Sequence, residues 1–185
     1  MKNYLTGERV CLRAMEPEDP AVLYEIENDP AMWVVSSFTV PYSRYTLKEY
    51  ISLSQNDVFA DKQLRLMITD RADQSVVGTI DITDFVPLHG RGAVGVAVLA
   101  REQGQGYASE ALRLLCEYAL GFLRFRQLYA HVPVSNEASM RLFTQAGFVR
   151  CGLLKDWICR DNRFEDAVLM QRLADTPSPS SEQIS

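Results

Sequence analysis

The segment from Ala93 to Leu120 constrains the fold of this 185-residue chain more than any other. It opens with an apolar, valine-rich run, residues 93–99, which predicts a strand buried on both faces. A turn containing Gly104 and Gly106 follows. From Tyr107 onward, apolar residues recur at the three- and four-residue spacing of a helix with one buried face. The segment therefore predicts a strand, a glycine turn and a helix in succession, with apolar residues of the helix continuing to Phe122.

The glycine turn predicts a site for an anion. Glycine lets the backbone approach a ligand closely, and the free N–H groups of a helix N-terminus carry about half a positive charge. No Lys-Ser or Lys-Thr pair follows Gly106, and the glycine spacing differs from G-x-G-x-x-G. The expected ligand therefore carries phosphate, but neither a nucleoside triphosphate nor a dinucleotide is favoured.

Length and composition predict one folded domain over residues 1–173. The chain is 47% apolar and 23% charged, which is ordinary for a soluble globular protein. No apolar run is long enough to cross a bilayer, and the first residues carry no signal-peptide core, so a cytoplasmic location is expected. Residues 174–185 are polar and rich in Pro and Ser, which predicts a disordered tail.

The charge is uneven along the chain. The net charge is −5, and acidic residues clearly outnumber basic ones between Glu16 and Asp84. This acidity argues against direct binding of nucleic acid and is compatible with a cationic substrate. A solvated surface that only aids solubility is the alternative. The four cysteines form no C-x-x-C pair and show no histidine spacing for zinc, so they are interpreted as reduced packing residues and no metal site is predicted.

The remaining elements follow from local patterns. Strands are predicted over residues 9–13, 64–69, 76–82, 127–133, 148–155 and 164–173. Helices are predicted from Pro20, with Asp19 as its cap, over residues 46–55, and from Ser135 or Asn136 to Gly147. Residues 85–92 are predicted to be a loop. The strands over residues 93–99 and 127–133, joined by a helix, predict a parallel pair in a right-handed unit.

Three motifs in order resemble a known family. They are Arg101-x-x-Gly104-x-Gly106, Asn136-Glu-Ala-Ser139 and Ala146-Gly147-Phe148. Together they resemble the acetyl-CoA half of the GNAT N-acetyltransferases, in the branch of ribosomal-protein N-terminal acetyltransferases and spermidine or diamine acetyltransferases. The resemblance covers residues 8–173. It implies an α/β (α+β) fold, with a twisted mixed sheet of about seven strands, a splayed parallel pair and about four flanking helices.

The resemblance also implies acetyl-CoA as co-substrate and a set of residues that bind it. The exposed edge of the central strand would pair with the pantetheine arm, the glycine turn would hold the pyrophosphate, and the next helix would contact the donor. The residues implied are Val96, Ala97 and Val98; Arg101, Gln103, Gly104, Gln105, Gly106, Tyr107 and Ala108; and Asn136 and Ser139.

Acetyl transfer to an amine requires a base for the amine, a partner for the departing thiolate and an N–H for the oxyanion. A backbone N–H near Val98 is expected to serve the oxyanion. Many relatives carry Tyr seven residues after the motif Asn, but here Phe143 stands there and excludes a tyrosine acid. Ser139 is the expected thiolate partner. A small residue needed for close helix packing is the alternative.

The base is less well defined. Ala93 stands where many relatives have a glutamate, which leaves Asp81 and Asp84, at the end of the preceding strand, as the catalytic carboxylates. Either could bind the ammonium group or accept its proton through water, and strand-end solvation is the alternative reading of both. His89, in a loop, is a less favoured base, and His131, among apolar residues, is interpreted as a core histidine.

The predicted function is acetyl-CoA-dependent N-acetylation of a primary amine by direct attack. The acceptor would be a small polyamine-like cation or a protein N-terminal amine, with no nucleic-acid or membrane partner, in a monomer or a homo-oligomer. Two alternatives stay open: a non-catalytic acyl-CoA-binding sensor or regulatory module, and an acetyltransferase of amine drugs.

Overall fold

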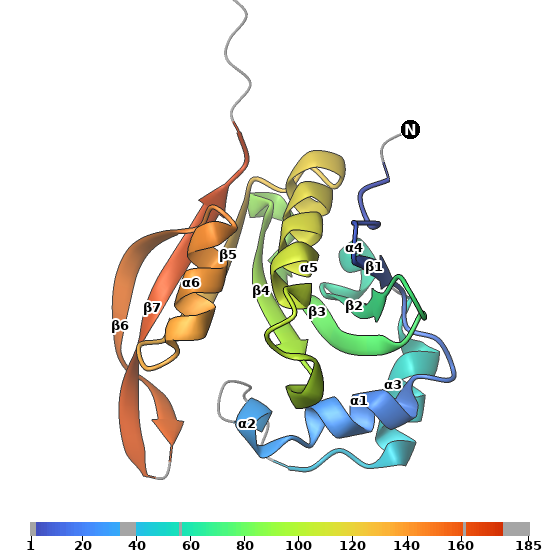
Figure 1. Cartoon of the computed structure of the whole chain (residues 1–185). Coiled ribbons are helices and arrows are strands. Elements are labelled where there is room, and N and C mark those ends of the chain that lie inside the picture. Colours follow the sequence, from blue (N-terminus) through green and yellow to red (C-terminus); the bar gives the residue numbers. More distant parts are fainter. Residues whose placement is uncertain (1–2, 34–39, 56, 161, 176–185) are drawn as a thin grey trace, which may run out of the picture.

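A seven-stranded mixed sheet in the order β1-β2-β3-β4-β5-β7-β6 organises the chain (Figure 1). The computed structural model describes residues 3–33, 40–55, 57–160 and 162–175. The neighbouring strands are antiparallel except β4 and β5, which are parallel, as predicted. The strands are β1 (Val10–Arg13), β2 (Leu64–Asp70), β3 (Val76–Val86), β4 (Arg91–Val98), β5 (Gln127–Pro133), β6 (Val149–Arg160) and β7 (Arg163–Leu173).

Helices cover the sheet. They are α1 (Pro20–Glu27), α2 (Pro30–Trp33), α3 (Arg44–Leu53), α4 (Val58–Asp61), α5 (Tyr107–Cys116) and α6 (Glu137–Gln145). In Figure 1, α5 and α6 lie over one face, where Leu112 and Phe143 join the main core. On the opposite face, α1 and α3 bury Leu23 and Leu47 around Met67 of β2. The four longer helices predicted from the sequence are α1, α3, α5 and α6. The short helix α4 was not predicted.

The helix after the glycine turn ends earlier than its periodicity predicts. After Cys116 the chain forms a π-helical turn over Glu117–Phe122, in which the amide of Leu123 donates to the carbonyl of Tyr118 at 2.9 Å. A π-helical turn has more residues than an α-helical one, so it rotates the residues beyond it around the axis. Phe122, predicted on the buried face, is therefore 55% exposed, and its ring stacks on that of Tyr118.

Two other local predictions were wrong. β3 continues to Val86 and β4 begins at Arg91, so half of the predicted loop is strand. Phe85 is buried, and its ring stacks on that of Phe125 with centroids 4.2 Å apart. Asp19 does not cap α1 with its side chain, since Arg13 on β1 holds both carboxylate oxygens at 2.7 and 2.9 Å.

The cysteine prediction holds only in part. All four thiols are free, and Cys116 is buried, where burial raises its pKa to about 11. Cys151 and Cys159 are exposed, so they are not packing residues. Most of the predicted tail, residues 176–185, lies outside the described residues.

Candidate active site

The parallel strands β4 and β5 separate after a short ladder. Their paired residues end at Ala93 and Tyr129. The amide of Leu99 donates to the carbonyl of Val77 on β3 at 2.9 Å. Because the backbone groups of successive strand residues point to alternate edges, Val96 and Val98 direct their N–H and C=O groups toward β5, into the opening. The splayed pair predicted from the sequence is therefore present, with a polar backbone edge.

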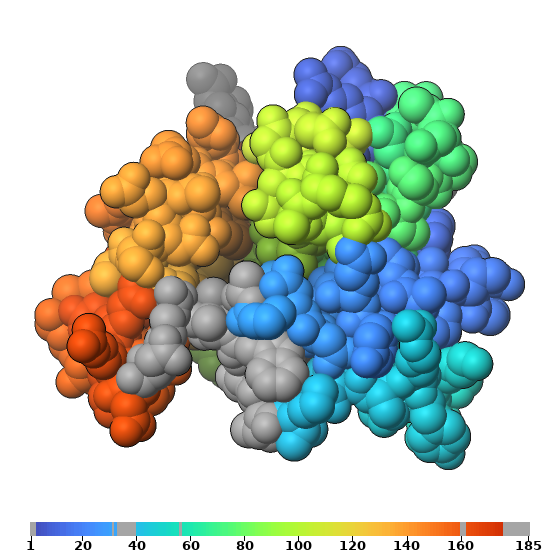
Figure 2. Space-filling view, turned by 60° about the horizontal axis from the view of Figure 1, so that its bottom comes forward, coloured from blue at the N-terminus to red at the C-terminus, as the bar shows by residue number. Residues whose placement is uncertain are grey.

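The glycine loop closes one end of this opening. Gly104 and Gly106 have φ angles of +79° and +86°, in the left-handed region that favours glycine, and Gly106 immediately precedes α5. A Cβ built on Gly104 would meet no atom within 4 Å, so the space over the loop is open. Figure 2 shows this end of the molecule, with the loop and the start of α5 in yellow-green between α1 in blue and α6 in orange.

The long side chains of the loop are held by the protein itself. Arg101 forms an ion pair with Glu25 of α1. The Nε2 of Gln103 donates to the carbonyl of Val98 at 3.1 Å. The hydroxyl of Tyr107 donates to Asp70, which raises the pKa of Tyr107 to about 12. The surface of the loop at its glycines therefore consists mainly of backbone groups. An anion-binding turn requires such groups.

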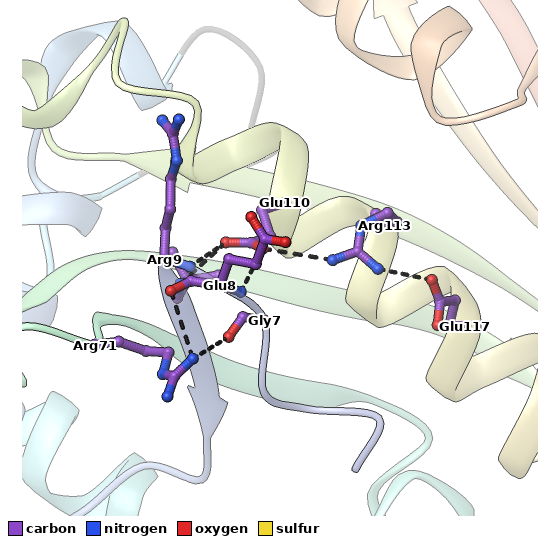
Figure 3. A network of polar contacts seen from close by, with 8 residues as sticks. Gly7, Glu8, Arg9, Arg71, Glu110, Arg113 and Glu117 are labelled. Carbon is purple, nitrogen blue, oxygen red and sulfur yellow. Dashed lines mark hydrogen bonds and ion pairs between the residues drawn. The ribbon is translucent and has the colours of Figure 1, made fainter. Parts of the chain in front are cut away.

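Arg9 adds a positive charge to this loop, and sequence reasoning missed it. Its Nη1 donates to the carbonyl of Gln105 at 2.7 Å. The segment before β1 is held in place by Glu110 on the first turn of α5, whose carboxylate accepts from the amides of Glu8, Arg9 and Val10 at 2.7, 2.8 and 3.1 Å (Figure 3). The contact joins residues about a hundred positions apart, and no local pattern indicates it.

A pocket of about 510 Å³ lies on the β1 side of the loop. It shares two residues with the predicted donor site, and the others come from the β1 and β2 ends. Its lining is Glu8, Arg9, Asp70, Arg71, Ala72, Gln105 and Tyr107.

At the other side of the opening, Asn136 begins α6. Its Oδ1 accepts from the amide of Ser139 at 3.0 Å, so the helix cap is present as predicted. Ser139 is half-buried on the first turn. Phe143 is buried, with its ring edge-on to Phe148 at 5.0 Å, so this position belongs to the core and supplies no proton.

Asp81 lies in a charge cluster on the face that carries α1 and α3. Arg65 of β2 donates to both its oxygens at 2.8 and 2.9 Å, and also pairs with the buried Glu27 of α1. Burial raises the pKa of Glu27, although Arg65 opposes this. Burial alone would lower the pKa of Arg65, but the carboxylate of Asp81 raises it above the usual value. The carboxylate predicted as a base is thus already neutralised by an arginine.

Asp84 lies instead at a bulge of β3, exposed and with φ of +49°. Burial raises the pKa of Tyr129 and lowers that of His131, both on β5, and the charge of Asp84 adds to the first shift and opposes the second. The interpretation of His131 as a core histidine was wrong. Leu128, Ala130 and Val132 point into the core, and the alternation of a strand places His131 on the opposite face, where it is exposed.

Two kinds of feature are absent from the described residues. No group of three or more His, Cys, Asp or Glu side chains there is arranged to hold a metal ion. Within the same residues, no helix has both the length and the apolar character needed to span a membrane.

Comparison with known proteins identifies the class. Residues 9–149 match the acetyltransferase (GNAT) domain family. An uncharacterized N-acetyltransferase of Bacillus licheniformis is 28% identical over 170 residues, 91% of this chain and 95% of that protein. The spermidine N(1)-acetyltransferase of Vibrio cholerae is 22% identical over 167 residues, 89% and 92% of the two chains.

Solved structures show the same fold. The spermidine N-acetyltransferase from Vibrio cholerae in complex with CoA and spermine has a TM-score of 0.80, with 22% identity over 91% of this chain and 97% of that one. A putative ribosomal-protein-serine acetyltransferase from Vibrio cholerae has a TM-score of 0.71, with 19% identity over 91% and 96%. The chain belongs to the GNAT acetyltransferase family, and it is an acetyltransferase enzyme.

Proposed function

We propose that this enzyme transfers acetyl from acetyl-CoA to a primary amine by direct attack, without a covalent acyl-enzyme. The observation that carries the proposal is the opening after the Ala93–Tyr129 pair. It exposes the backbone groups of Val96 and the N–H of Val98 beside a glycine loop at the N-terminus of α5, which suits an extended arm ending in a pyrophosphate.

The donor residues are then assigned by position. The loop from Arg101 to Ala108 receives the pyrophosphate, chiefly through backbone N–H groups, with Arg9 as an added cation. The backbone of residues 96–98 pairs with the pantetheine arm and offers an N–H to the thioester oxygen. Asn136 shapes the start of α6, and the Ser139 hydroxyl donates to the departing thiolate, whose thiol has an ordinary pKa of about 8.5.

The acceptor is a small polyamine-like cation in preference to a protein N-terminus. The face opposite α5 and α6 carries more acid than base: Glu27 and Asp81 share one arginine, and Asp84 is exposed nearby on β3. A site with surplus negative charge attracts cations. The named substrates of the Vibrio cholerae relative are of the same chemical class.

An acceptor screen tests the proposal. Purified protein is mixed with acetyl-CoA and with diamines, polyamines, aminoglycosides or short peptides, and thiol release is measured. Release with diamines or polyamines above the amine-free rate is the expected result. Binding of CoA with no release for any amine would favour the sensor instead, and release with peptides or aminoglycosides alone would reassign the acceptor.

A further inference from the structure

Three aromatic side chains form a row across the face of the sheet opposite α5 and α6. The ring centroids of Tyr129 and His131, both on β5, are 5.5 Å apart at 65°. Those of His131 and Trp157, on β6, are 5.4 Å apart at 49°. Trp157 is 54% exposed, so the row is open to solvent. We call Tyr129, His131 and Trp157, together with the carboxylate of Asp84, the acceptor row.

Two β-bulges flank the row. On β3 the register shifts between Thr83 and Val86, with Asp84 at φ +49°; on β6 it shifts between Leu154 and Ile158, with Asp156 also at φ +49°. Bulges redirect side chains, and left-handed backbone outside glycine is concentrated at functional sites. In this structure the β6 bulge lies next to Trp157, whose indole contacts His131, and the β3 bulge carries Asp84, whose charge acts on both Tyr129 and His131.

The β6 bulge is held by Asp166 on β7. Its carboxylate accepts from the Nζ of Lys155 at 2.7 Å and from the amide of Asp156 at 3.0 Å. The indole of Trp157 therefore reaches past β7 to the imidazole of His131 from a fixed backbone.

The row borders the opening between β4 and β5. Ala93 and Tyr129 are the last paired residues, and Gly95 and His131 are the next residues along each strand on that same face. Gly95 is exposed, and a Cβ built on it would meet nothing within 4 Å. An acceptor coming from this face would therefore reach the thioester, assigned to the backbone edge of β4, between Gly95 and His131.

We propose that the acceptor row binds the protonated primary alkylamine substrate and that His131 takes its proton before attack. This rests on the proposed function. The aromatic rings and the Asp84 carboxylate attract an ammonium group. The amine gives one proton to His131, and its nitrogen then bonds to the thioester carbon. The C–S bond breaks, the nitrogen loses a second proton to the departing thiolate, and His131 returns the first proton to water.

The surroundings of His131 suit a base at neutral pH. Burial by the neighbouring strands lowers its pKa below the usual value, and Asp84 on β3 partly offsets this. The rings of Tyr129, on the same strand, and of Trp157, on β6, contact the imidazole. Leu169 of β7 is the residue opposite His131 in the sheet, and the charge of Arg91 on β4 opposes the rise in the pKa of Tyr129. A lowered pKa favours the neutral imidazole, which is the form that can accept a proton.

The test compares His131→Gln with wild type, using acetyl-CoA and 1,4-diaminobutane. We expect kcat to fall about 100-fold, the acidic limb of the pH profile of kcat/KM to disappear, and CoA affinity to stay unchanged. Trp157→Ala should raise KM for the diamine about tenfold, whereas Leu153→Ala, an exposed residue of the same strand that lies outside the row, should not.

The possible failures are distinguishable. If wild type acetylates the diamine and His131→Gln keeps both its kcat and its acidic limb, the acceptor row is wrong while the proposed function stands. The imidazole proton resonances give a readout without turnover: titration of the CoA complex with the diamine should shift those of His131. A wild-type enzyme without turnover and without this shift would overturn both proposals.

Discussion

Arg65 donates from Nε and Nη2 to the two carboxylate oxygens of Asp81, at 2.8 and 2.9 Å, between the neighbouring strands β2 and β3. Both side chains are mostly buried. Arg65 also pairs with Glu27, so the two strands are connected to α1. The two carboxylates that the sequence predicts as equivalent catalytic candidates therefore differ. Asp81 is paired with an arginine, whereas Asp84 is exposed.

Asp81→Asn should therefore act first on stability. Loss of the carboxylate leaves Arg65 with one partner in a buried site, and we expect a loss of about 2–3 kcal/mol in the free energy of unfolding. Asp84→Asn, at an exposed position, should change it by less than about 0.5 kcal/mol. Urea denaturation measures both. A stable Asp81→Asn protein that has lost only turnover would restore Asp81 as a catalytic carboxylate.

Gly104→Glu should weaken CoA binding severely. The substitution places a carboxylate and a side chain over the open backbone of the loop, and we expect affinity to fall about 100-fold, or roughly 2.8 kcal/mol at about 1.4 kcal/mol per tenfold. Gly147→Glu is the control, since it has a similar φ of +84° but lies at the end of α6. Calorimetric titration measures the CoA affinity of wild type and of both variants. Equal affinities of wild type and Gly104→Glu would refute the phosphate loop.

Arg9→Gln should weaken CoA binding without changing turnover at saturating donor. Arg9 stands beside the loop through its bond to the Gln105 carbonyl, so its charge supports an anion there. The effect should shrink at high salt, since this side chain is exposed. The CoA dissociation constant at two ionic strengths provides the measurement. An unchanged constant at low salt would show that Arg9 only holds the loop.

Ser139→Ala should lower kcat about tenfold, as expected when one hydrogen bond worth roughly 1.4 kcal/mol is lost from a developing thiolate. CoA affinity should stay the same, because the helix cap uses the backbone amide of Ser139 and the side chain of Asn136. Ser139→Thr, which keeps the hydroxyl, should retain more activity. Steady-state kinetics at saturating amine measures kcat, and equal values for wild type and Ser139→Ala would assign Ser139 to packing.

Glu110→Gln should destabilise the protein in a pH-dependent way. Burial alone would raise the pKa of Glu110, but the three backbone N–H donors outweigh it and hold the pKa below the usual value. The folded state then binds fewer protons than the unfolded one. The stabilisation is therefore present above about pH 4.5 and is lost as the pH falls through the lowered pKa. Urea midpoints of wild type and variant from pH 3 to 7 should converge on the acidic side, and a constant gap would contradict this.

The errors of the sequence prediction have two physical causes. An inserted feature changes the faces of the residues that follow it: the π-helical turn exposes Phe122, and the β3 bulge leaves Asp84 outside the regular ladder at φ +49°. A local pattern can also be misread. The alternation of Leu128, Ala130 and Val132 with Tyr129 and His131 was available, and it would have placed His131 outside the core.

The strands along the chain, the glycine loop and the cap of α6 could be predicted from the sequence alone, because each depends on residues close together: apolar periodicity, glycines where φ is positive, and Asn136 before a helix. The parallel pair followed from the strand–helix–strand succession. The tertiary structure decided which side chains share a site. Arg9 contacts the loop, Arg65 pairs with Asp81, and Trp157 contacts His131. These contacts form because strands distant in sequence pair in one sheet and because bulges redirect side chains. Local periodicity encodes neither effect.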